Sequence, residues 1–526
     1  MKSFRSAFGA MVSALLVVAC GGTNTETAAP NQSTTHGTLV ENPPLRLASV
    51  NATAFQAQLA SSSQGQQLLQ LAGTPVCGVD FYYLQFNTVG GAGETTQSTG
   101  AMMVPTGPGT CSGPRPIVLY AHGFTTLKTT NLADIANTSN SEGALLAAMF
   151  AAQGYIVVAP NYAGYDTSTL GYHPFINATQ NSGEMMDILA AARSGLPKTF
   201  SSATSDNGKL FVTGYSEGGF VAMATMRALQ AAGAKITAAA PMSGPYAMEA
   251  FLDAIVFGNV NLGSTQFSPM LTTSWQKAYG NIYANTTDFY SSTYASGIDT
   301  LLPSATPIDQ LISTGKLPQT ALFDSTTPVV TVPGDPTTSA KLTAALAVPS
   351  NPLFQLGFGE PFLINNSVRI GYALDAAVNP DGAVPTPSAG VPLAAAPPTY
   401  PLRKAAYTND MRTGPWGPME PTLLCGGNQD PTIFFSVNTG TMAAFWAPEV
   451  QAGLVTVLDV SGTPGGPFAP IQTAFQNAAA QLIAFYESPA GGGLSAAAAA
   501  QKAIAGYHGA VAPFCTLAAR SFFANF

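Results

Sequence analysis

The sequence predicts an α/β fold: a mostly parallel central sheet with helices on both faces and a large, mainly helical cap inserted between two strands. Strand-length and helix-length segments alternate between residues 116 and 242. The strand segments are apolar throughout, which is typical of parallel strands buried on both faces. The alternation stops over residues 246–415 and resumes at residue 422.

Each element of the expected sheet and its helices follows in chain order. Segments Phe81–Phe86 and Gly100–Pro105 predict an antiparallel pair at the edge of the sheet, joined by a Gly/Thr-rich turn over 89–99. The further strands are expected at Pro116–Tyr120, Tyr155–Ala159, Lys209–Thr213, Ile236–Met242, Thr422–Cys425 and Leu454–Val460. The intervening helices are expected at Gly143–Gln153, Ser182–Ser194 and Phe220–Ala231.

The segment 246–415 breaks this pattern with helical fragments separated by Pro and Gly. The fragments are Met248–Phe257, Thr272–Ile282, Ile308–Ser313 and Thr337–Leu346, followed by a Pro/Ala-rich loop over 379–401. A long insertion between core strands is typical of a cap over a binding site, and a set of ordinary surface loops is the alternative. We therefore expect core segments at 46–245 and 416–526, with a cap or lid at 246–415.

The first 45 residues predict export rather than folded structure. Lys2 and Arg5 precede a short apolar run that ends at Cys20, which is typical of a signal peptide over 1–19. The position of Cys20 resembles a bacterial lipobox, which implies a lipidated cysteine and a flexible tether over 20–45. Gly21 follows, without the aspartate that resembles an inner-membrane retention signal. We expect a protein anchored to the bacterial envelope, at the outer membrane, or secreted; an ordinary signal peptide with a stray cysteine is the alternative.

Composition limits the partners. Charged residues make up 9% of the chain, and the net charge goes from −8 to −10 once Lys2 and Arg5 are removed. No basic patch is present to bind phosphates, so nucleic acid is not an expected partner. No later segment is long and apolar enough to cross a bilayer, so the lipid anchor is the expected membrane contact. We expect a monomer.

Four cysteines remain beside the one assigned to lipid, and an even number in an exported protein predicts two disulfides. Three pairings are possible. We favour Cys77–Cys111 and Cys425–Cys515 because each pair joins neighbouring parts of the expected architecture. A zinc site is not expected, because no C-x-x-C is present and the histidines lie far apart, and no other metal or cofactor is indicated.

Residues 209–219, KLFVTGYSEGG, predict a nucleophile. An apolar strand enters a sharp turn at Ser216, and Gly214 and Gly218 allow a helix to start without a clash against that strand. This is the nucleophile elbow of the α/β-hydrolase fold, in which the serine Oγ is exposed at the top of the sheet. A tight strand-to-helix turn with an inert serine is the alternative.

The base follows by elimination. In this fold the acid and the histidine come after the serine, and the chain has only four histidines. His36, His122 and His173 precede Ser216, so His508 alone is eligible. Its Gly and small-residue neighbours predict a loop; an exposed loop histidine without a catalytic role is the alternative.

The expected acid is Asp430, just past the strand Thr422–Cys425, where its carboxylate can accept a hydrogen bond from His508 Nδ1–H and stabilise the imidazolium. Asp459 also ends a strand. That strand is the last one, after which the fold usually places the histidine, so we favour Asp430. A Cys425–Cys515 bond would hold the acid strand to the segment after His508.

Two backbone N–H groups are expected to bind the oxyanion. One belongs to Glu217, which follows the nucleophile at a helix N-terminus. The other is expected from Phe124 in the loop after Tyr120, with Gly123 as the alternative. We expect His122 to shape this loop, and His173 to brace a loop near the rim or to line the pocket.

Seven sequence elements together resemble the secretory lipase family of α/β-hydrolases, in its bacterial form. They are YAHG from Tyr120, APNYAGY from Ala159, YHPF from Tyr172, GYSEGG from Gly214, PTLLCGGNQD from Pro421, YHG from Tyr507 and PFC from Pro513. The resemblance covers roughly residues 75–525. It implies cofactor-free hydrolysis of carboxylic esters, often acylglycerols, by Ser216, Asp430 and His508 under a helical cap.

The function expected from these observations is a serine esterase or lipase acting on small-molecule or lipid esters. A serine peptidase or aminopeptidase on the same fold is one alternative, and the apolar, Thr/Ser-rich cap favours esters over it. A polyester or plant-wall ester hydrolase is another. A surface lipoprotein without enzymatic activity is the last, and the intact Ser–Asp–His order argues against it.

Overall fold

The structure is a computed structural model that describes residues 36–137, 140–381, 397–414 and 416–526. The expected signal peptide, Cys20 and most of the tether lie outside the described residues, as does most of the Pro/Ala-rich loop at 379–401. Those predictions therefore stay predictions.

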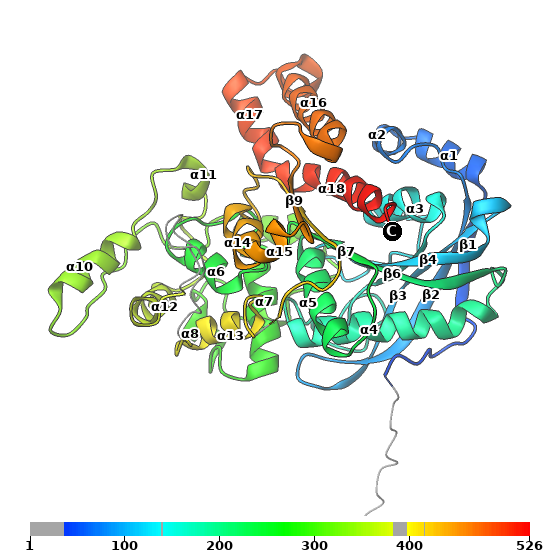
Figure 1. The fold of residues 1–526 in the computed structure, drawn as a ribbon. Helices are drawn as coiled ribbons and strands as arrows, with labels where there is room; N and C mark the ends of the chain where they lie inside the picture. Colours follow the sequence, from blue (N-terminus) through cyan, green and yellow to red (C-terminus); the bar gives the residue numbers. More distant parts are fainter. Residues whose placement is uncertain (1–35, 138–139, 382–396, 415) are drawn as a thin grey trace, which may run out of the picture. The chain divides into compact units, whose positions relative to one another are not determined.

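The described residues contain a nine-stranded sheet in the order β1-β2-β3-β5-β4-β6-β7-β8-β9 (Figure 1). β1, β2, β3 and β5 pair antiparallel, whereas β5, β4, β6, β7, β8 and β9 run parallel. The strands are β1 (Leu45–Val50), β2 (Gly78–Val89), β3 (Thr95–Thr106), β4 (Gly113–Ala121), β5 (Ile156–Pro160), β6 (Thr204–Tyr215), β7 (Ala238–Met242), β8 (Thr422–Gly426) and β9 (Val455–Asp459). The predicted fold class is confirmed.

The antiparallel edge differs from the prediction in two ways. The predicted pair is a longer hairpin, with Gly78 opposite Thr106 and a turn over 90–94 only. The sheet also continues beyond this hairpin to β1, which now forms the edge. Residues before β1 bond to β2: Gly37 N–H donates to Asn87 O at 2.9 Å, and Val40 N–H donates to Gln85 O at 2.8 Å. The last residues assigned to the tether therefore pack on β2.

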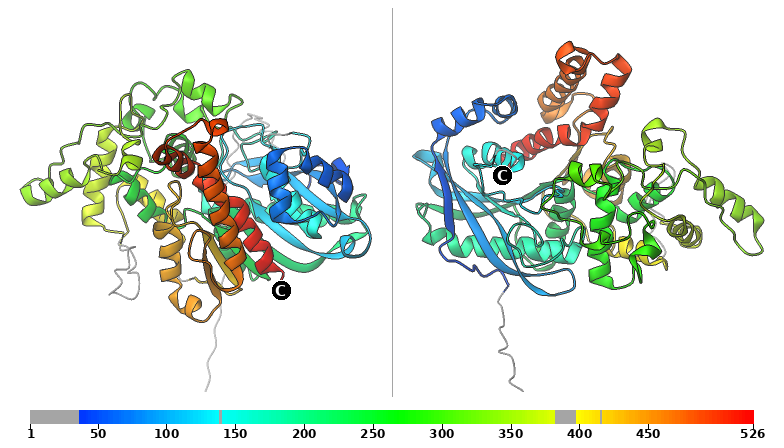
Figure 2. Two further views of the ribbon diagram at one scale, coloured as in Figure 1. Left: turned by 90° about the horizontal axis from the view of Figure 1, so that it is seen from above. Right: turned by 180° about the vertical axis from the view of Figure 1, so that it is seen from behind.

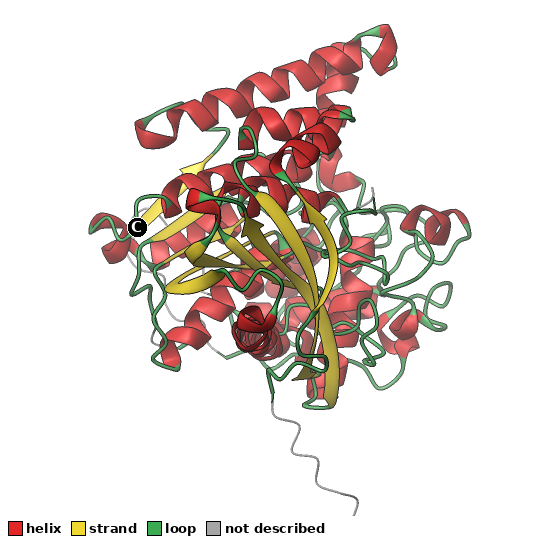
Figure 3. Cartoon of the chain, turned by 90° about the vertical axis from the view of Figure 1, so that its right-hand side faces the viewer, coloured by secondary structure: helices red, strands yellow, loops and turns green. Residues whose placement is uncertain are grey.

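Helices cover both faces of the sheet, because each buried strand presents apolar side chains alternately to two separate cores. Tyr82, Leu84 and Phe86 of β2 pack with α4 (Ala178–Gly195) and α5 (Glu217–Ala231), whereas Phe81 packs with the opposite core. That core contains α3 (Ser141–Met149) and α18 (Tyr507–Phe523), and Figures 1 and 3 show helices on both faces.

The segment between β7 and β8 is mainly helical, and Figures 1 and 2 show its helices gathered beside one end of the sheet. The helices are α6 (Met248–Val256), α7 (Ser264–Tyr279), α8 (Thr286–Phe289), α9 (Ile308–Ser313), α10 (Pro336–Ala345), α11 (Pro352–Gln355), α12 (Asn366–Val378) and α13 (Pro401–Asn409). α7 starts eight residues before the predicted helix. Pro269 lies inside it, and a proline lacks the N–H that an interior position requires, so the sequence there argues against a helix.

The remaining helices lie at the two ends of the described chain. They are α1 (Ala52–Ala60), α2 (Ser63–Ala72), α14 (Thr441–Phe445), α15 (Ala447–Gln451), α16 (Ala469–Glu487) and α17 (Ala496–Ala505). α16 and α17 pair with each other and lie above α18 in Figure 1. In the described part of the chain, no helix is both long and apolar enough to span a membrane.

Both predicted disulfides are confirmed. Cys77, just before β2, bonds to Cys111, just before β4, with 5.3 Å between their Cα atoms. Cys425 in β8 bonds to Cys515 in α18, with a Cα–Cα distance of 5.7 Å. The second bond joins the strand before Asp430 to the helix that carries His508.

Candidate active site

Ser216 occupies the sharp turn between β6 and α5. Its backbone has φ 61° and ψ −123°, which is a region that a non-glycine residue rarely adopts and that costs conformational energy. The turn is held by the sheet, since Ser216 N–H donates to Met242 O of β7 at 3.0 Å. The residue is 8% exposed. The structure thus gives Ser216 the strained conformation of a nucleophile elbow.

Glycines allow this turn to pack closely. A Cβ atom on Gly218 would lie 1.9 Å from Ala121 O in β4, and one on Gly214 would lie 2.3 Å from Gly218 O. Real Cβ atoms do not approach backbone atoms so closely, so any side chain at either position would push α5 away from the sheet. These two glycines therefore fix the elbow against β4.

Asp430 and His508, which are 78 residues apart, meet through a hydrogen bond. His508 Nδ1 lies 2.6 Å from Asp430 Oδ2. The other carboxylate oxygen of Asp430 accepts from the backbone N–H groups of Thr432 at 2.8 Å and Ile433 at 3.0 Å. Because both carboxylate oxygens accept, Asp430 orients the imidazole so that Nδ1 carries a proton and Nε2 offers its lone pair.

His508 is the second residue of α18, so the prediction of a loop at this position is wrong. The helix begins at Tyr507, directly after Gly506, because the small residues there let α17 and α18 follow each other without a loop. Gly427 lets the acid loop reach this helix end, since a Cβ atom there would lie 2.4 Å from Tyr507 Oη.

The second ring nitrogen of His508 is free. Nε2 is buried and has no hydrogen-bond partner among the described residues, Ser216 included. The neighbour of the serine, Tyr215, touches the same histidine: its hydroxyl donates to His508 O, and the two ring centroids are 5.0 Å apart. Hydrogen bonds between a nucleophile and its base are often long in unliganded enzymes.

Asp459 is occupied elsewhere. Its Oδ1 accepts from Asn428 N–H at 3.1 Å and from both the N–H and the hydroxyl of Ser461, at 2.9 and 2.7 Å. It thereby ties the end of β9 to the loop after β8. Of the two carboxylates weighed from the sequence, the structure brings Asp430 to His508.

The loop after β4 lies beside Ser216. A Cβ atom on Gly123 would be 3.7 Å from Ser216 Cβ, and both Phe124 and Glu217 line the same cavity as Ser216. Gly123 N–H donates to the two carboxylate oxygens of Glu142, at 3.1 and 3.3 Å. Glu142 therefore engages the Gly123 amide, and Phe124 stays the predicted donor.

His122 has the structural position expected of it. Its Nδ1 lies 2.6 Å from Gly123 O and its Nε2 lies 3.1 Å from Asn161 O. The ring stacks on Tyr162 with a centroid distance of 4.1 Å. Both nitrogens thus engage backbone carbonyls that shape the loop.

His173 differs from the expectation of a residue at the rim. It is buried, and its Nε2 lies 2.6 Å from Glu217 Oε1 while its Nδ1 lies 3.1 Å from Ala163 O. Sequence reasoning missed this pair, and also the role of Glu142. The one signal available was the rarity of charge, since an acidic residue next to a nucleophile is conspicuous in a chain with 9% charged residues.

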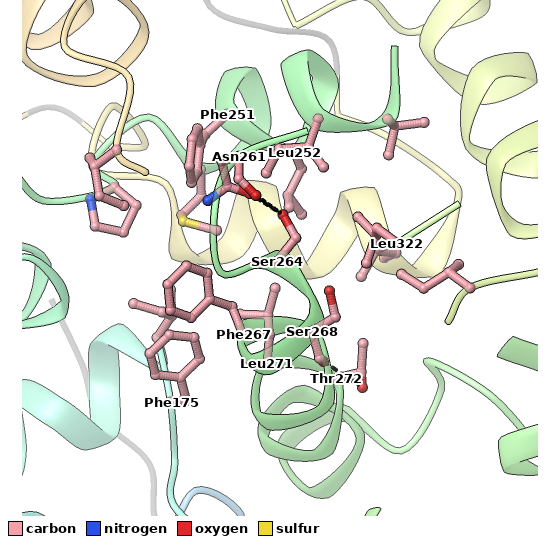
Figure 4. A pocket seen from close by; sticks show the side chains of 18 of the residues that line it. Phe175, Phe251, Leu252, Asn261, Ser264, Phe267, Ser268, Leu271, Thr272 and Leu322 are labelled. Atoms are coloured by element: carbon pink, nitrogen blue, oxygen red, sulfur yellow. Dashed lines mark hydrogen bonds between the residues drawn. The ribbon is translucent and has the colours of Figure 1, made fainter. Parts of the chain in front are cut away.

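A cavity opens beside Ser216 and extends under the cap (Figure 4). The cavity volume is about 90 Å³, so the cavity is narrow. Its wall is mainly apolar. In addition to Ser216, the lining residues include Phe124, Phe175, Phe251, Leu252, Ile255, Phe267, Leu271, Phe289, Leu322, Phe323, Ile364, Val368 and Ile433. The polar exceptions include Asn261, Ser264, Ser268, Thr272 and Arg369.

The phenyl rings nearest the core pack against one another. Phe124 and Phe267 meet edge to face with centroids 4.6 Å apart, and Phe175 lies 5.4 Å from Phe124. Figure 4 shows Phe175 and Phe267 side by side at this part of the cavity. This part of the cavity wall is therefore apolar. Among the described residues, no group of His, Cys, Asp or Glu side chains is arranged to hold a metal ion.

Comparison with known proteins gives matches to this architecture. The model of the Prolyl oligopeptidase family matches residues 144–265, which include the elbow and are less than a quarter of the chain. No curated protein matches.

Solved structures match over most of the chain. The rice cell wall degrading esterase LipA from Xanthomonas oryzae is 24% identical with a TM-score of 0.60, over 84% of this chain and 96% of that chain. Its ligand-bound form gives 24% and 0.59, over 81% and 91%. A putative hydrolase from Legionella pneumophila is 18% identical with a TM-score of 0.57, over 80% and 91%. Together with the sheet order and the elbow, these likenesses show that the chain has the α/β-hydrolase fold.

Proposed function

We propose that this protein is a serine carboxylic-ester hydrolase with Ser216 as nucleophile, His508 as base and Asp430 as acid. One observation carries the proposal. The Asp430–His508 pair leaves Nε2 without a partner, in a fold that places a strained elbow serine at an apolar cavity. An imidazole with one nitrogen held by a carboxylate and the other free is what general-base catalysis requires.

The reaction proceeds by acyl transfer through two steps. His508 Nε2 takes the proton of Ser216 Oγ as that oxygen attacks the ester carbonyl, and the amides of Phe124 and Glu217 bind the oxyanion. The N-terminus of α5 adds its partial positive charge at the same place. The imidazolium, stabilised by Asp430, then protonates the leaving alcohol. Water repeats the sequence on the acyl-enzyme and frees the acid.

The cavity supports an acyl substrate. Its narrow, mainly apolar space suits a slender hydrocarbon chain, whose burial is favoured by about 0.8 kcal/mol for each CH₂ group. We propose a small-molecule or lipid ester as substrate, a monomeric enzyme, and export to the bacterial envelope with a lipid on Cys20. The two disulfides fit an oxidising compartment.

A serine peptidase is the second candidate, favoured by the match to the Prolyl oligopeptidase family over the elbow region. A peptide amine would need a carboxylate as its partner. Among the described residues that line the cavity, Glu217 alone has a carboxylate; its Oε1 lies 2.6 Å from His173 Nε2, and its Oε2 has no hydrogen-bond partner. The mainly apolar wall favours esters. A polymer ester substrate stays a third possibility, since a structural neighbour is described as a cell wall degrading esterase.

The test is hydrolysis of p-nitrophenyl esters of increasing acyl length by the purified protein lacking residues 1–20. Wild type is compared with Ser216→Ala and with Ser194→Ala, a matched serine on the exposed face of α4. We expect Ser216→Ala to lose about four orders of magnitude or more in kcat/KM, and Ser194→Ala to retain the wild-type value. Substantial activity in folded Ser216→Ala contradicts the proposal; hydrolysis of an aminoacyl anilide in preference to every ester favours the peptidase.

A further inference from the structure

Arg369 is a buried cation in the wall of the acyl cavity. It lies on α12 in the cap, its side chain is 0% exposed, and it shares the cavity with Ser216. Most of the wall around it is apolar, including the neighbouring Phe323, Ile364 and Val368. A charge in such surroundings requires partners to offset the loss of hydration.

The partners of Arg369 are incomplete. Nε and Nη2 both donate to Val256 O, at 3.3 and 2.9 Å. The guanidinium lies over the rings of Phe323 and Phe358, at 4.4 and 5.2 Å from their centroids. Nη1 is buried and donates to no acceptor in the described part of the chain. Among the described residues, the Nη1 donor of the guanidinium is thus unpaired.

Arg403, the other buried arginine of the described residues, has carboxylate partners: it lies 3.0 Å from Asp375 and 3.3 Å from Asp253. The less buried Arg412 lies 2.9 Å from Asp381 and 2.6 Å from Asp410. Arg369 has no carboxylate within the 4.0 Å of an ion pair among the described residues. Arg403 thus has carboxylates around its guanidinium, whereas Arg369 has none within that distance among the described residues.

The guanidinium is charged despite its burial. Burial lowers the pKa of Arg369 to about 10, and the more distant Asp324 opposes this shift. At neutral pH the group is therefore a cation, and a carboxylate brought into the cavity would gain both charge complementarity and the open Nη1 donor.

We propose that Arg369 is an anion-binding subsite at the cap side of the acyl cavity, and that it binds a carboxylate at the far end of the substrate acyl chain. The inference rests on the proposed ester hydrolase function. The preferred substrates are then half-esters of straight-chain dicarboxylic acids, with the ester at Ser216 and the free carboxylate at Arg369. The narrow cavity suits the slender chain between them.

The test compares two matched series of substrates. One contains mono-p-nitrophenyl half-esters of hexanedioic to dodecanedioic acid, and the other contains p-nitrophenyl esters with the same number of chain atoms and a methyl end. The measured quantity is the ratio of kcat/KM for half-ester to neutral ester at each length. In wild type we expect this ratio to exceed one at the length that spans the cavity, and in Arg369→Met to fall at least tenfold.

Two control variants separate charge from packing. Arg369→Lys retains a cation and is expected to restore part of the ratio, whereas Arg227→Met removes an arginine that stacks on Trp416 away from the cavity wall and is expected to leave the ratio as in wild type. A purely structural role for Arg369 would lower both kcat/KM values equally and leave the ratio unchanged, which would overturn the proposal. So would a wild-type ratio below one at every length.

A binding measurement keeps the test independent of turnover. Ser216→Ala should bind the monomethyl ester of an alkanedioate, measured by calorimetry, more tightly than the dimethyl ester of equal length, which has no free carboxylate. Ser216→Ala/Arg369→Met should lose this difference. Equal binding of both esters by Ser216→Ala would overturn the subsite. Failure of all ester hydrolysis together with selective binding of the monomethyl ester would instead contradict the proposed function alone.

Discussion

Two histidine–carboxylate pairs near Ser216 have the same N···O distance but differ in the contacts of the second ring nitrogen. His508 meets Asp430 and His173 meets Glu217, each at 2.6 Å. His508 Nε2 has no partner in the described residues, whereas His173 Nδ1 lies 3.1 Å from Ala163 O. An imidazole can accept a proton only through a free lone pair. The comparison therefore favours His508 as the general base and His173 as a residue that holds Glu217 in place.

Both ring nitrogens of His173 are engaged: Nε2 lies 2.6 Å from Glu217 Oε1 and Nδ1 lies 3.1 Å from Ala163 O. Neither nitrogen is free to accept a proton from Ser216. This pair supports the elbow and stays outside the proton transfer.

The strongest test of this difference exchanges the two histidines for inert side chains. We expect His508→Ala to lower kcat/KM for an ester by about 10⁴–10⁶-fold, because the base is gone. We expect His173→Gln to lower it by about tenfold, because a support is weakened and the base is retained. Comparable losses in the two folded variants would contradict the assignment.

The two carboxylates at the ends of β8 and β9 allow a matched test of the acid. Asp430→Asn removes the charge that fixes the His508 tautomer, and we expect a loss of about 10⁴-fold in kcat. Asp459→Asn disturbs only the contacts to Asn428 and Ser461, and we expect a change of no more than about threefold. If the larger loss falls on Asp459→Asn, the acid has been misassigned.

The two disulfides lie in different parts of the fold: Cys425–Cys515 is near the candidate active site, and Cys77–Cys111 is near the antiparallel strands. Breaking Cys425–Cys515 by serine substitution frees a loop of 90 residues, and breaking Cys77–Cys111 frees one of 34. Chain entropy predicts losses of about 4–5 and 3–4 kcal/mol in the free energy of unfolding. We also expect only the first to lower kcat, since it joins the strand before Asp430 to the helix of His508. Denaturant titration and ester hydrolysis measure the two effects, and a kcat loss from the second bond alone would contradict this view.

The support role of His173 predicts a thermodynamic coupling with Glu217. Removal of one member of a buried ion pair typically costs about 3–5 kcal/mol, because the other is left unpaired. We expect His173→Gln and Glu217→Gln each to destabilise the protein, and the double variant to cost less than the two losses combined. Additive losses in the double-mutant cycle would show that the two side chains act independently.

A smaller effect, which depends on pH, is expected at Glu249. Its contact with Arg403 does not fully offset the cost of burying its charge. Burial, with a further contribution from Asp381, raises the pKa of Glu249 to about 8. Between about pH 4.5 and 8 the folded state thus holds a proton that the unfolded state has released, so stability falls as the pH rises. We expect Glu249→Gln to gain roughly 1–3 °C in melting temperature relative to wild type between pH 5 and 8. A relative loss over that range would contradict the sign.

The sequence predicted the core of this fold well and the cap less well. Strands such as β8 are short apolar runs buried on both faces, so their positions follow from local composition, and the chain order of Ser216, Asp430 and His508 follows from the fold. The helical position of His508 did not, because glycine and alanine around it fit a loop or a helix start. The carboxylate of Glu217 found its partner His173 only through packing between residues 44 positions apart.

The cap illustrates the limit most clearly. α12 and α13 carry the buried residues Arg369 and Arg403, but their order in space depends on contacts between distant segments. An arginine in the sequence gives no sign of whether a carboxylate will be nearby. Only the structure distinguishes Arg403, which has several, from Arg369, which has none within ion-pair distance in the described residues.

Covalent labelling of Ser216 tests the central claim most directly. A fluorophosphonate reacts with a serine only when a base activates it, and mass spectrometry of the digested protein locates the label. The proposed mechanism predicts one label on the peptide containing Ser216 in wild type and in His173→Gln, and none within the same time in His508→Ala. Folded wild-type protein that takes up no label, or labelling of His508→Ala at the wild-type rate, would contradict it.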